Sequence, residues 1–339
     1  MLSTPYRSEA TGEEEPPGPL PPRPAGRLRA LVAADRGLPI AVGAVGAALT
    51  MALHTWIPNG AVNLGSLFQT FLPWAGLSVP VLLLAAAVRR SRLAAVAVLA
   101  PVAVWGCLFG GTLIDKRSER SGGGNFTVVS HNVDEENSDP ARTARALAAS
   151  GADVLALEEM SSKATPVYER ELAAGYPYRS DTLGVRLWSK HPLNGVEAVP
   201  IMPWTRAVRA TVETPGGPVA VFAAHLASVR VTPAAGFTTA QRNDAARKLA
   251  EAVRAEPLAR VVVMGDFNGT AEDSALRPVT SRLTSAQGEA GAGFGFTWPA
   301  AFPMVRIDQI LVKGMGVTSA WTLPATGSDH LPVAASLRL

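Results

Sequence analysis

The hydrophobic pattern of the first third of the chain is dominated by three stretches that contain no Asp, Glu, Lys or Arg, at positions 37–56, 66–88 and 93–114. A helix that rises about 1.5 Å per residue needs roughly 20 residues to cross the hydrocarbon core of a bilayer, and each stretch has about that length. A cleaved signal peptide has one short apolar core near the N-terminus, and a buried helical hairpin is the other alternative. Three full-length stretches favour three transmembrane helices over both.

The segments that flank these stretches predict how the chain is placed in the membrane. Residues 1–36 are rich in Pro, Glu and Arg and bury too little apolar surface to fold, so we expect a disordered cytoplasmic tail. Basic residues precede the first stretch and fill the turn at 89–92, whereas 57–65 carries no charge. The positive-inside rule therefore predicts a multi-pass cell-membrane protein with a cytoplasmic N-terminus and an extracytoplasmic C-terminal region. The basic run at 115–120 points the other way, but long domains translocate largely regardless of such charges.

The pattern changes after the Gly-rich segment 121–125, where runs of β-branched and alternating residues begin. We expect 115–125 to be a flexible linker and 126–339 a separate domain. Start and stop signals predict helices at 139–151 and 239–255. Strands are predicted at 126–132, 152–159, 184–190, 206–214, 219–226, 259–267, 306–313 and 332–339. Strands outnumber helices, which favours two antiparallel or mixed sheets with helices outside them.

Charge and cysteine content narrow the class of the 126–339 domain. It contains 20 Lys and Arg against 21 Asp and Glu, so the net positive charge of the chain, +3, lies in the tail and the membrane loops. A protein that grips many phosphates of a nucleic acid needs a clustered cationic face, and a near-neutral domain argues against that function. The single cysteine, Cys107, lies in the third apolar stretch, so the domain has no disulfide and depends on its apolar core.

Polar residues that could do chemistry recur at the ends of the predicted strands. A carboxylate after a strand is ordinarily a turn or cap residue, and a strand histidine such as His225 is more often structural than catalytic. Asp308 is different, because a carboxylate inside a buried run is costly unless it is paired, and a histidine would be its natural partner. Oxygen ligands without a cysteine cluster or a short-spaced histidine pair suit Mg²⁺ or Mn²⁺ rather than zinc. The candidates are Asn132, Glu158, Glu159, His225, Asp266, Asn268, Asp308, Asp329 and His330.

In their order along the chain, these residues lie in a series of motifs that resembles the endonuclease/exonuclease/phosphatase superfamily. The motifs are "SHNV", "DVLALEE", "GVRLWSKHPL", "AAHL", "GDFN", "FTWPAAFPMVRIDQILV" and "GSDHLPV". Each motif alone is weak, whereas the ordered series covers nearly all of 126–339. The resemblance implies a DNase I-like fold, a four-layer α/β sandwich, here preceded by three transmembrane helices.

The resemblance also implies roles for the candidates. Asn132 and Glu159 would hold a divalent metal, Mg²⁺ or Mn²⁺, and Asp329 would complete the metal or water shell. Asp266 would orient or deprotonate the attacking water. Asn268 and His225 would contact the phosphate, and Asp308 would pair with His330. Glu158 departs from the family pattern, which usually has Gln before the metal-binding Glu, and this leaves open which glutamate ligates. For Arg206 and Arg209 a phosphate contact is weighed against an ordinary strand-surface position.

Three functions remain open on the sequence. The first is a membrane-anchored phosphatase that acts outside the membrane on a lipid phosphate or pyrophosphate such as undecaprenyl pyrophosphate. Similar three-span members of the superfamily are associated with resistance to glycopeptides such as teicoplanin. The second is an extracellular nuclease or phosphodiesterase, and the third is a binding module that has lost catalysis. The intact series of site residues favours an enzyme.

Overall fold

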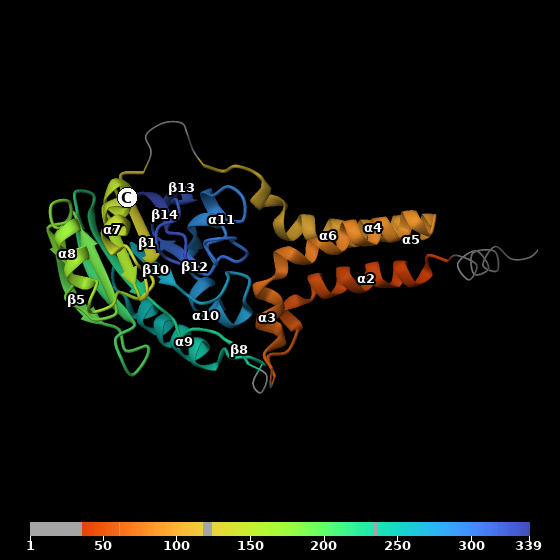
Figure 1. Ribbon diagram of the computed structural model, residues 1–339, viewed down its shortest axis with the longest axis horizontal. Coiled ribbons are helices and arrows are strands. Elements are labelled where there is room, and N and C mark those ends of the chain that lie inside the picture. The colour runs from red at the N-terminus through yellow and green to blue at the C-terminus, as the bar shows by residue number, and fades with distance from the viewer. Residues whose placement is uncertain (1–35, 61, 118–123, 233–235) are drawn as a thin grey trace, which may run out of the picture.

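The residues after 124 form four layers, in which two sheets pack face to face and helices cover the outer face of each (Figure 1). The computed structural model describes residues 36–60, 62–117, 124–232 and 236–339. The first sheet has the strand order β13 (Gly316–Thr322), β14 (Val333–Arg338), β1 (Phe126–Asn132), β2 (Val154–Glu158), β4 (Val185–Ser189), β3 (Tyr178–Arg179). The second has the order β11 (Thr284–Ser285), β12 (Asp308–Lys313), β10 (Val261–Asp266), β7 (Gly217–Ala224), β6 (Ala207–Thr214), β5 (Leu193–Ala198).

Both sheets are mixed, because each contains one parallel pair among antiparallel neighbours. β1 runs parallel to β2 in the first sheet, and β7 runs parallel to β10 in the second. Strands buried on both faces read as continuous apolar runs, and "VVVM" in β10 and "VLAL" in β2 are of this kind. The predicted architecture of two sheets with helices outside is confirmed.

The apolar core is divided by the sheets into a central part and two outer parts. The central part lies between the sheets and includes Val128, Val221 and Val262, all fully buried. On the outer face of the first sheet, α7 (Pro140–Ala149) and α8 (Thr165–Leu172) bury Leu147 and Leu172. On the outer face of the second lie α9 (Ala240–Ala255) and α10 (Arg277–Thr280). The remaining short elements are β8 (Val231–Thr232), β9 (Gly236–Phe237), η4 (Ser274–Leu276) and α11 (Ala286–Ala290).

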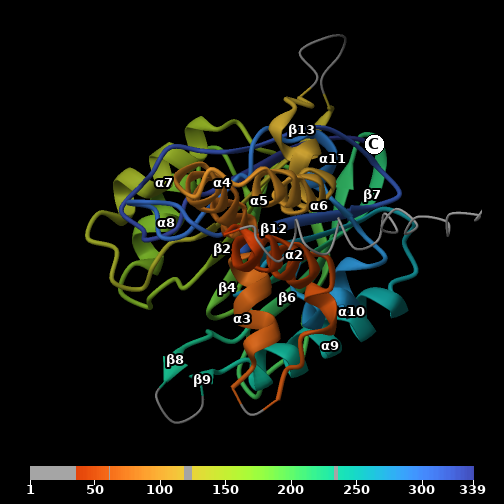
Figure 2. The same cartoon turned by 90° about the vertical axis from the view of Figure 1, so that its right-hand side faces the viewer.

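The N-terminal helices project from one side of the four-layer domain as an elongated bundle (Figures 1 and 2). Many of their large apolar side chains are exposed, among them Val42, Leu49, Val81, Leu84 and Val96. The elements are α2 (Leu38–Ala52), η1 (His54–Trp56), α3 (Leu64–Thr70), η2 (Leu72–Leu77), α4 (Ser78–Val88), α5 (Arg92–Ala97), α6 (Leu99–Phe109) and η3 (Gly110–Leu113). Such a surface is costly in water, so these helices need an apolar environment.

Within the described residues, one helix is both long and apolar enough to cross a membrane. It runs from Arg92 to Leu113, 22 residues with a mean hydropathy of 2.2. The second predicted span is broken, because α3 and the helix Leu72–Val88 meet at an angle of 72°. The first, α2, has 15 residues, fewer than the roughly 20 that a straight span needs. The prediction of three spans therefore stays a prediction.

The start of the predicted second span belongs to the contact with the α/β domain. Ser66, Gln69 and Thr70 of α3 are buried. The Ser66 hydroxyl donates to Asp273 Oδ1 at 3.1 Å, and the amide of Ser274 donates to Gln69 Oε1 at 2.7 Å. The number of apolar residues in a helix is the same whether its end is buried in protein or in lipid, so the sequence could not distinguish the two.

The tail and the linker are only partly described. The predicted disordered tail at 1–36 lies outside the described residues except for Arg36, and so do positions 118–123 of the predicted flexible linker. In the described part of the linker, Lys116 bonds to the α/β domain, its amide to Gly291 O at 3.2 Å and its ammonium to Gly288 O at 2.7 Å.

Candidate functional site

The candidate site lies where strands of the two sheets end. The parallel pairing of β1 and β2 sets Asn132 beside Glu158, and β7 ends just before His225. In the second sheet the antiparallel pairing of β10 and β12 sets Asp266 directly opposite Asp308. The two sheets face each other at these strands, so residues far apart in the sequence meet there.

Asp266 has the most hydrogen bonds of the candidate carboxylates. Its Oδ2 accepts from Asn132 Nδ2 at 3.1 Å and from Asn268 Nδ2 at 3.2 Å, and its Oδ1 accepts from the Asn268 amide at 2.8 Å. Asn268 has a left-handed backbone with φ of 46°, which Asn tolerates better than most residues. Burial raises the pKa of Asp266 to about 7, with Asp308 adding to the shift and His330 opposing it. A carboxylate with this pKa is suited to accept a proton near neutral pH.

Asp308 and His330 form the buried ion pair that the sequence predicts. Nδ1 of His330 lies 2.9 Å and 3.1 Å from the two carboxylate oxygens of Asp308. Although burial alone would lower it, Asp308 and the neighbouring carboxylates raise the pKa of His330 to about 10. Nδ1 is occupied by Asp308, so the Nε2 side faces Asp266 Oδ2 at 3.9 Å and Asp329 Oδ1 at 3.8 Å. His330 is therefore a cation at neutral pH.

His225 is held in the opposite charge state. Nη1 of Arg206 contacts Nδ1 of His225 and lies 3.2 Å from its Nε2. Because carboxylate oxygens of Glu159 and Asp266 face Nε2, the ring proton lies on Nε2, and Nδ1 accepts from Arg206. Burial and the positive charge of Arg206 hold the pKa of His225 well below its usual range. Nε2 lies 3.3 Å from Glu159 Oε1 and 3.6 Å from Asp266 Oδ2. His225 is thus a neutral donor at the centre of the site.

The two consecutive glutamates have different environments. Glu158 is fully buried, its Oε1 accepts from the Ser130 hydroxyl at 3.0 Å, and its Oε2 has no hydrogen-bond partner among the described residues. Burial, with the nearby Asp308, raises the pKa of Glu158 well above its usual range, so the side chain is a neutral acid. Glu159 has a left-handed backbone with φ of 56°, which turns its carboxylate toward His225. Such a conformation is uncommon for Glu and typical of functional sites.

Asp329 lies at the exposed rim of the site. Its carboxylate accepts from the Trp298 indole at 3.0 Å, and its side chain is 55 % exposed. The turn before it is anchored to the first sheet, because the Ser328 hydroxyl donates to Asn132 O at 2.6 Å and accepts from the His330 amide at 3.0 Å. The final strand β14 then holds this turn in the core.

The residues of the site fit a hard divalent cation. Several carboxylates converge, and the donor atoms of Asp266, Asp308 and His330 lie within 4.8 Å of one another. The buried carboxylates of Asp266 and Asp308 lie opposite each other on paired strands and oppose each other's ionisation, and a cation would relieve this repulsion. The His330 ring is engaged by Asp308, and Mg²⁺ prefers oxygen, so the carboxylates of this group and the amide oxygen of Asn132 are the ligand types that suit it.

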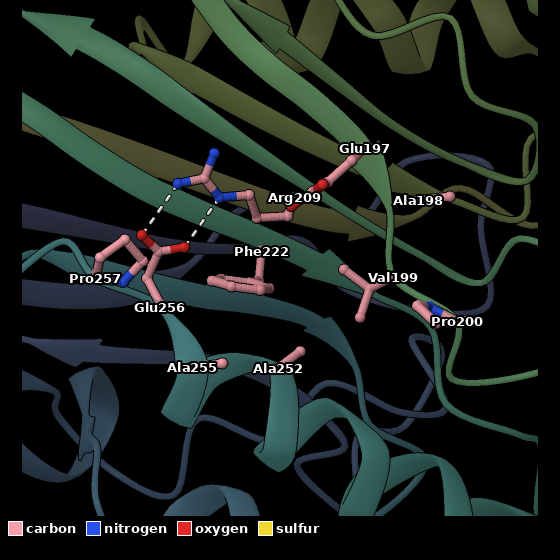
Figure 3. Close-up of a pocket in the computed structure, with 10 residues that line it drawn as sticks. All are labelled: Glu197, Ala198, Val199, Pro200, Arg209, Phe222, Ala252, Ala255, Glu256 and Pro257. Atoms are coloured by element: carbon pink, nitrogen blue, oxygen red, sulfur yellow. Dashed lines mark hydrogen bonds and ion pairs between the residues drawn. The ribbon is translucent and has the colours of Figure 1, made fainter.

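Eight of the nine candidates are joined by these contacts into one group, and the ninth, Glu158, is bonded to Ser130 beside it. Arg206 was weighed and set aside on the sequence, yet it touches His225. Arg209 is not part of the site, because its guanidinium pairs with Glu256 at 2.9 Å and 3.0 Å beside a separate cavity of about 470 Å³ (Figure 3). Trp298 is not among the predicted site residues, although it lies in the motif "FTWPAAFPMVRIDQILV" and its indole donates to Asp329.

The fold and the site together define a class, that of two-sheet α/β hydrolases with a carboxylate and histidine centre at the strand ends. The model of the Endonuclease/Exonuclease/phosphatase family matches residues 129–330, and the chain belongs to this family. Its members are nucleases, phosphodiesterases and phosphatases that use divalent metals, so the protein is a hydrolase of phosphate esters. No curated protein matches the chain.

Several solved structures share the fold. A zebrafish (D. rerio) TDP2 complexed with a single-strand DNA product has a TM-score of 0.54 at 18% identity, with 63% of this chain and 99% of that chain covered. A conserved protein of unknown function from Enterococcus faecalis V583 has a TM-score of 0.53 at 14% identity, covering 62% and 99%. A beta toxin from Staphylococcus aureus has a TM-score of 0.51 at 16% identity, covering 62% and 99%. At these identities the likeness shows the fold alone.

Proposed function

We propose that this enzyme is a membrane-anchored, divalent-metal-dependent phosphatase. It acts on a lipid phosphate or pyrophosphate at the extracytoplasmic surface of the cell membrane. Undecaprenyl pyrophosphate is the substrate we favour. By the resemblance to members associated with teicoplanin resistance, the cellular role we propose is in resistance to cell-wall antibiotics.

The observation that carries this proposal is the contact between the N-terminal helices and a loop of the site. The Trp74 indole donates to Met304 O at 2.7 Å, and its ring stacks on Phe296 with centroids 5.8 Å apart. The same loop, 294–305, carries Trp298, which binds Asp329. Helices with exposed apolar surfaces thus touch the rim of the catalytic site, where a membrane lipid headgroup is the nearest source of phosphate.

The position of the basic residues supports an outward-facing site. Arg89, Arg90 and Arg92 lie at the turn between α4 and α5, at the end of the bundle farthest from the α/β domain (Figure 1). The positive-inside rule places this end in the cytoplasm, and the domain would then lie on the other side of the membrane.

The residues of the site suit hydrolysis by an activated water. The cation held by Asn132, Glu159 and Asp329 would offset negative charge on the phosphate oxygens. Asp266, fixed by Asn132 and Asn268, accepts the proton of the attacking water. The His330 imidazolium and the Nε2 proton of His225 donate to the oxygens on which charge develops, and Asn268 adds an amide to the phosphate contacts.

The second candidate is an extracellular nuclease or phosphodiesterase. It draws support from the TDP2 structure, whose partner is a single-strand DNA product. The near-neutral charge of residues 126–339 and the docked apolar helices favour the lipid substrate.

Phosphate release by the purified full chain in detergent separates the two candidates. We expect release from polyprenyl pyrophosphate with Mg²⁺ or Mn²⁺, loss of release with EDTA, and no cleavage of duplex or single-stranded DNA. Cleavage of DNA without release from the lipid would establish the second candidate. An Asp266→Ala variant is the control for contaminating phosphatases.

A further inference from the structure

The N-terminal bundle contains an apolar groove that the catalytic chemistry does not use. It has a volume of about 400 Å³, and Leu77, Val102, Trp105 and Phe294 are among its walls. None of the described side chains that line it carries a charge. Gly76 lets the Trp105 indole, one wall of the groove, pack closely against the chain, because a Cβ at this position would overlap the indole, which is fixed by donation to Pro73 O at 2.8 Å.

This groove and the catalytic rim share one loop. Phe294 forms a wall of the groove and stacks on Phe296 with ring centroids 5.0 Å apart, and Phe296 in turn stacks on Trp74. Trp298, whose indole binds Asp329, lies only four residues beyond Phe294. Four residues span at most about 14 Å, so the groove wall lies within about that distance of the rim of the site.

The surroundings of the groove indicate what occupies it. Exposed Leu77 lies at its wall on a bundle whose outer surface is apolar, so a hydrocarbon chain can enter from a bilayer. A polar or charged molecule would lose its hydration without gaining a partner among these side chains. Phe294 at the groove wall belongs to the loop that carries Trp298, beside the carboxylate and histidine centre where the anionic headgroup of the proposed substrate would bind.

We propose that this groove binds the hydrocarbon chain of the lipid whose phosphate is hydrolysed at the site. The inference rests on the proposed function and deepens it, because it makes chain length a determinant of specificity. Each methylene buried in such a groove strengthens binding by about fourfold. Long-chain lipid pyrophosphates are therefore better substrates than short-chain pyrophosphates with the same headgroup.

The test is a pair of valine-to-tryptophan variants in the full chain, assayed in detergent with two substrates. Val102→Trp fills the groove, whereas Val96→Trp adds the same ring to an exposed position of α5 that does not line it. We expect Val102→Trp to raise KM for a long-chain polyprenyl pyrophosphate about tenfold or more with kcat nearly unchanged. For dimethylallyl pyrophosphate, kcat/KM should stay within about twofold, which also shows that the variant is folded. Val96→Trp should leave kcat and KM unchanged for both substrates.

Other outcomes separate the inference from the proposed function. The groove does not bind the chain if the wild type hydrolyses both pyrophosphates with equal kcat/KM, or if Val102→Trp lowers kcat/KM equally for both. The proposed phosphatase function would still stand in either case. If the wild type releases phosphate from neither, the proposed function itself fails. A second measurement does not depend on the folding of Val102→Trp, because it uses the wild type. A diazirine-labelled polyprenyl phosphate should crosslink to residues of α4 and α6 that line the groove. Crosslinks only at other positions would contradict the inference.

Discussion

At the scale of single residues, the site places two chemically identical neighbours, Glu158 and Glu159, in different environments. Glu158 is a buried neutral acid, whereas Glu159 is partly exposed and faces His225. A neutral Glu158 carries the same kind of donor and acceptor as the Gln that the family usually has at this position. The departure from the family pattern thus need not add a charge to the site.

The first prediction compares the two glutamates directly. Glu158→Gln should retain kcat/KM within about threefold, because a neutral group replaces a neutral group. Glu159→Gln should lower kcat/KM by about 100-fold and weaken activation by Mg²⁺, since a ligand carboxylate is lost. Mg²⁺ titration of steady-state rates measures both effects. Equal losses in the two variants would show that both glutamates are charged and functional.

The second prediction concerns the pH dependence set by the Asp308 and His330 pair. His330 has a pKa of about 10 against an ordinary value of 6.5, so the wild type should keep the imidazolium and its activity up to about pH 10. Asp308→Asn removes the main attraction for this proton, and the alkaline limb of kcat/KM should move toward neutral pH. A pH–rate profile of both proteins measures this shift. An unmoved limb in Asp308→Asn would assign it to another group.

At the scale of secondary-structure elements, α3 connects the bundle to the catalytic loop through buried polar groups. Ser66 donates to Asp273, which forms an ion pair with Arg242 of α9 at 2.6 Å. Arg242 also donates to Asn268 O at 3.1 Å, next to the Asp266 loop. Arg242 and Asp273 are fully buried, so each charge is stabilised by the other in place of water.

The third prediction follows from that burial. Asp273→Asn leaves the Arg242 charge unpaired, and the free energy of unfolding should fall by about 3–5 kcal/mol. Asp244→Asn is the matched control, because Asp244 lies in α9, the helix of Arg242, and its half-exposed side chain pairs with Arg247 and Lys248. It should leave the free energy of unfolding nearly unchanged, because water and salt screen such surface ion pairs. Chemical denaturation in detergent measures both, and equal costs would rule out the buried pair as a stabilising contact.

At the scale of the whole molecule, the bundle and the α/β domain share an aromatic interface. Trp105 and Phe109 of α6 meet Phe294 edge-on at centroid distances of 6.2 Å and 5.8 Å. Removing the bundle would uncover this surface and free the loop that carries Trp298. The bundle therefore covers part of the loop that carries Trp298.

The fourth prediction tests this with a chain that begins at residue 124. We expect a melting temperature below that of the full chain, because each uncovered aromatic side chain forfeits about 1.5–3 kcal/mol of apolar burial. kcat/KM for a short water-soluble pyrophosphate should fall as well. Differential scanning calorimetry and phosphate release measure the two effects. Full stability and activity in the shortened chain would show that the bundle only anchors the domain.

Much of the fold could be predicted from local patterns. Asp139 accepts from the Arg142 amide at 3.0 Å at the start of α7, where the sequence predicted an N-cap. The central strands were predicted because they are buried on both faces and therefore apolar throughout. The edge strands β5 and β13 were missed, since most of their side chains are at least partly exposed and give no alternating signal.

The sequence by itself determined which residues end the strands, and hence that carboxylates, amides and histidines gather at one end of the sheets. It also determined that the N-terminal region is apolar enough to need a partner. Only the tertiary structure decided that Glu158 is buried and that Glu159 faces His225. It also decided that Arg206 contacts the site whereas Arg209 pairs with a glutamate elsewhere, and that Ser66 bonds to Asp273. The reason is physical: local patterns fix which face of an element is apolar, whereas charge state and partner depend on what the other sheet or helix brings within a few ångströms.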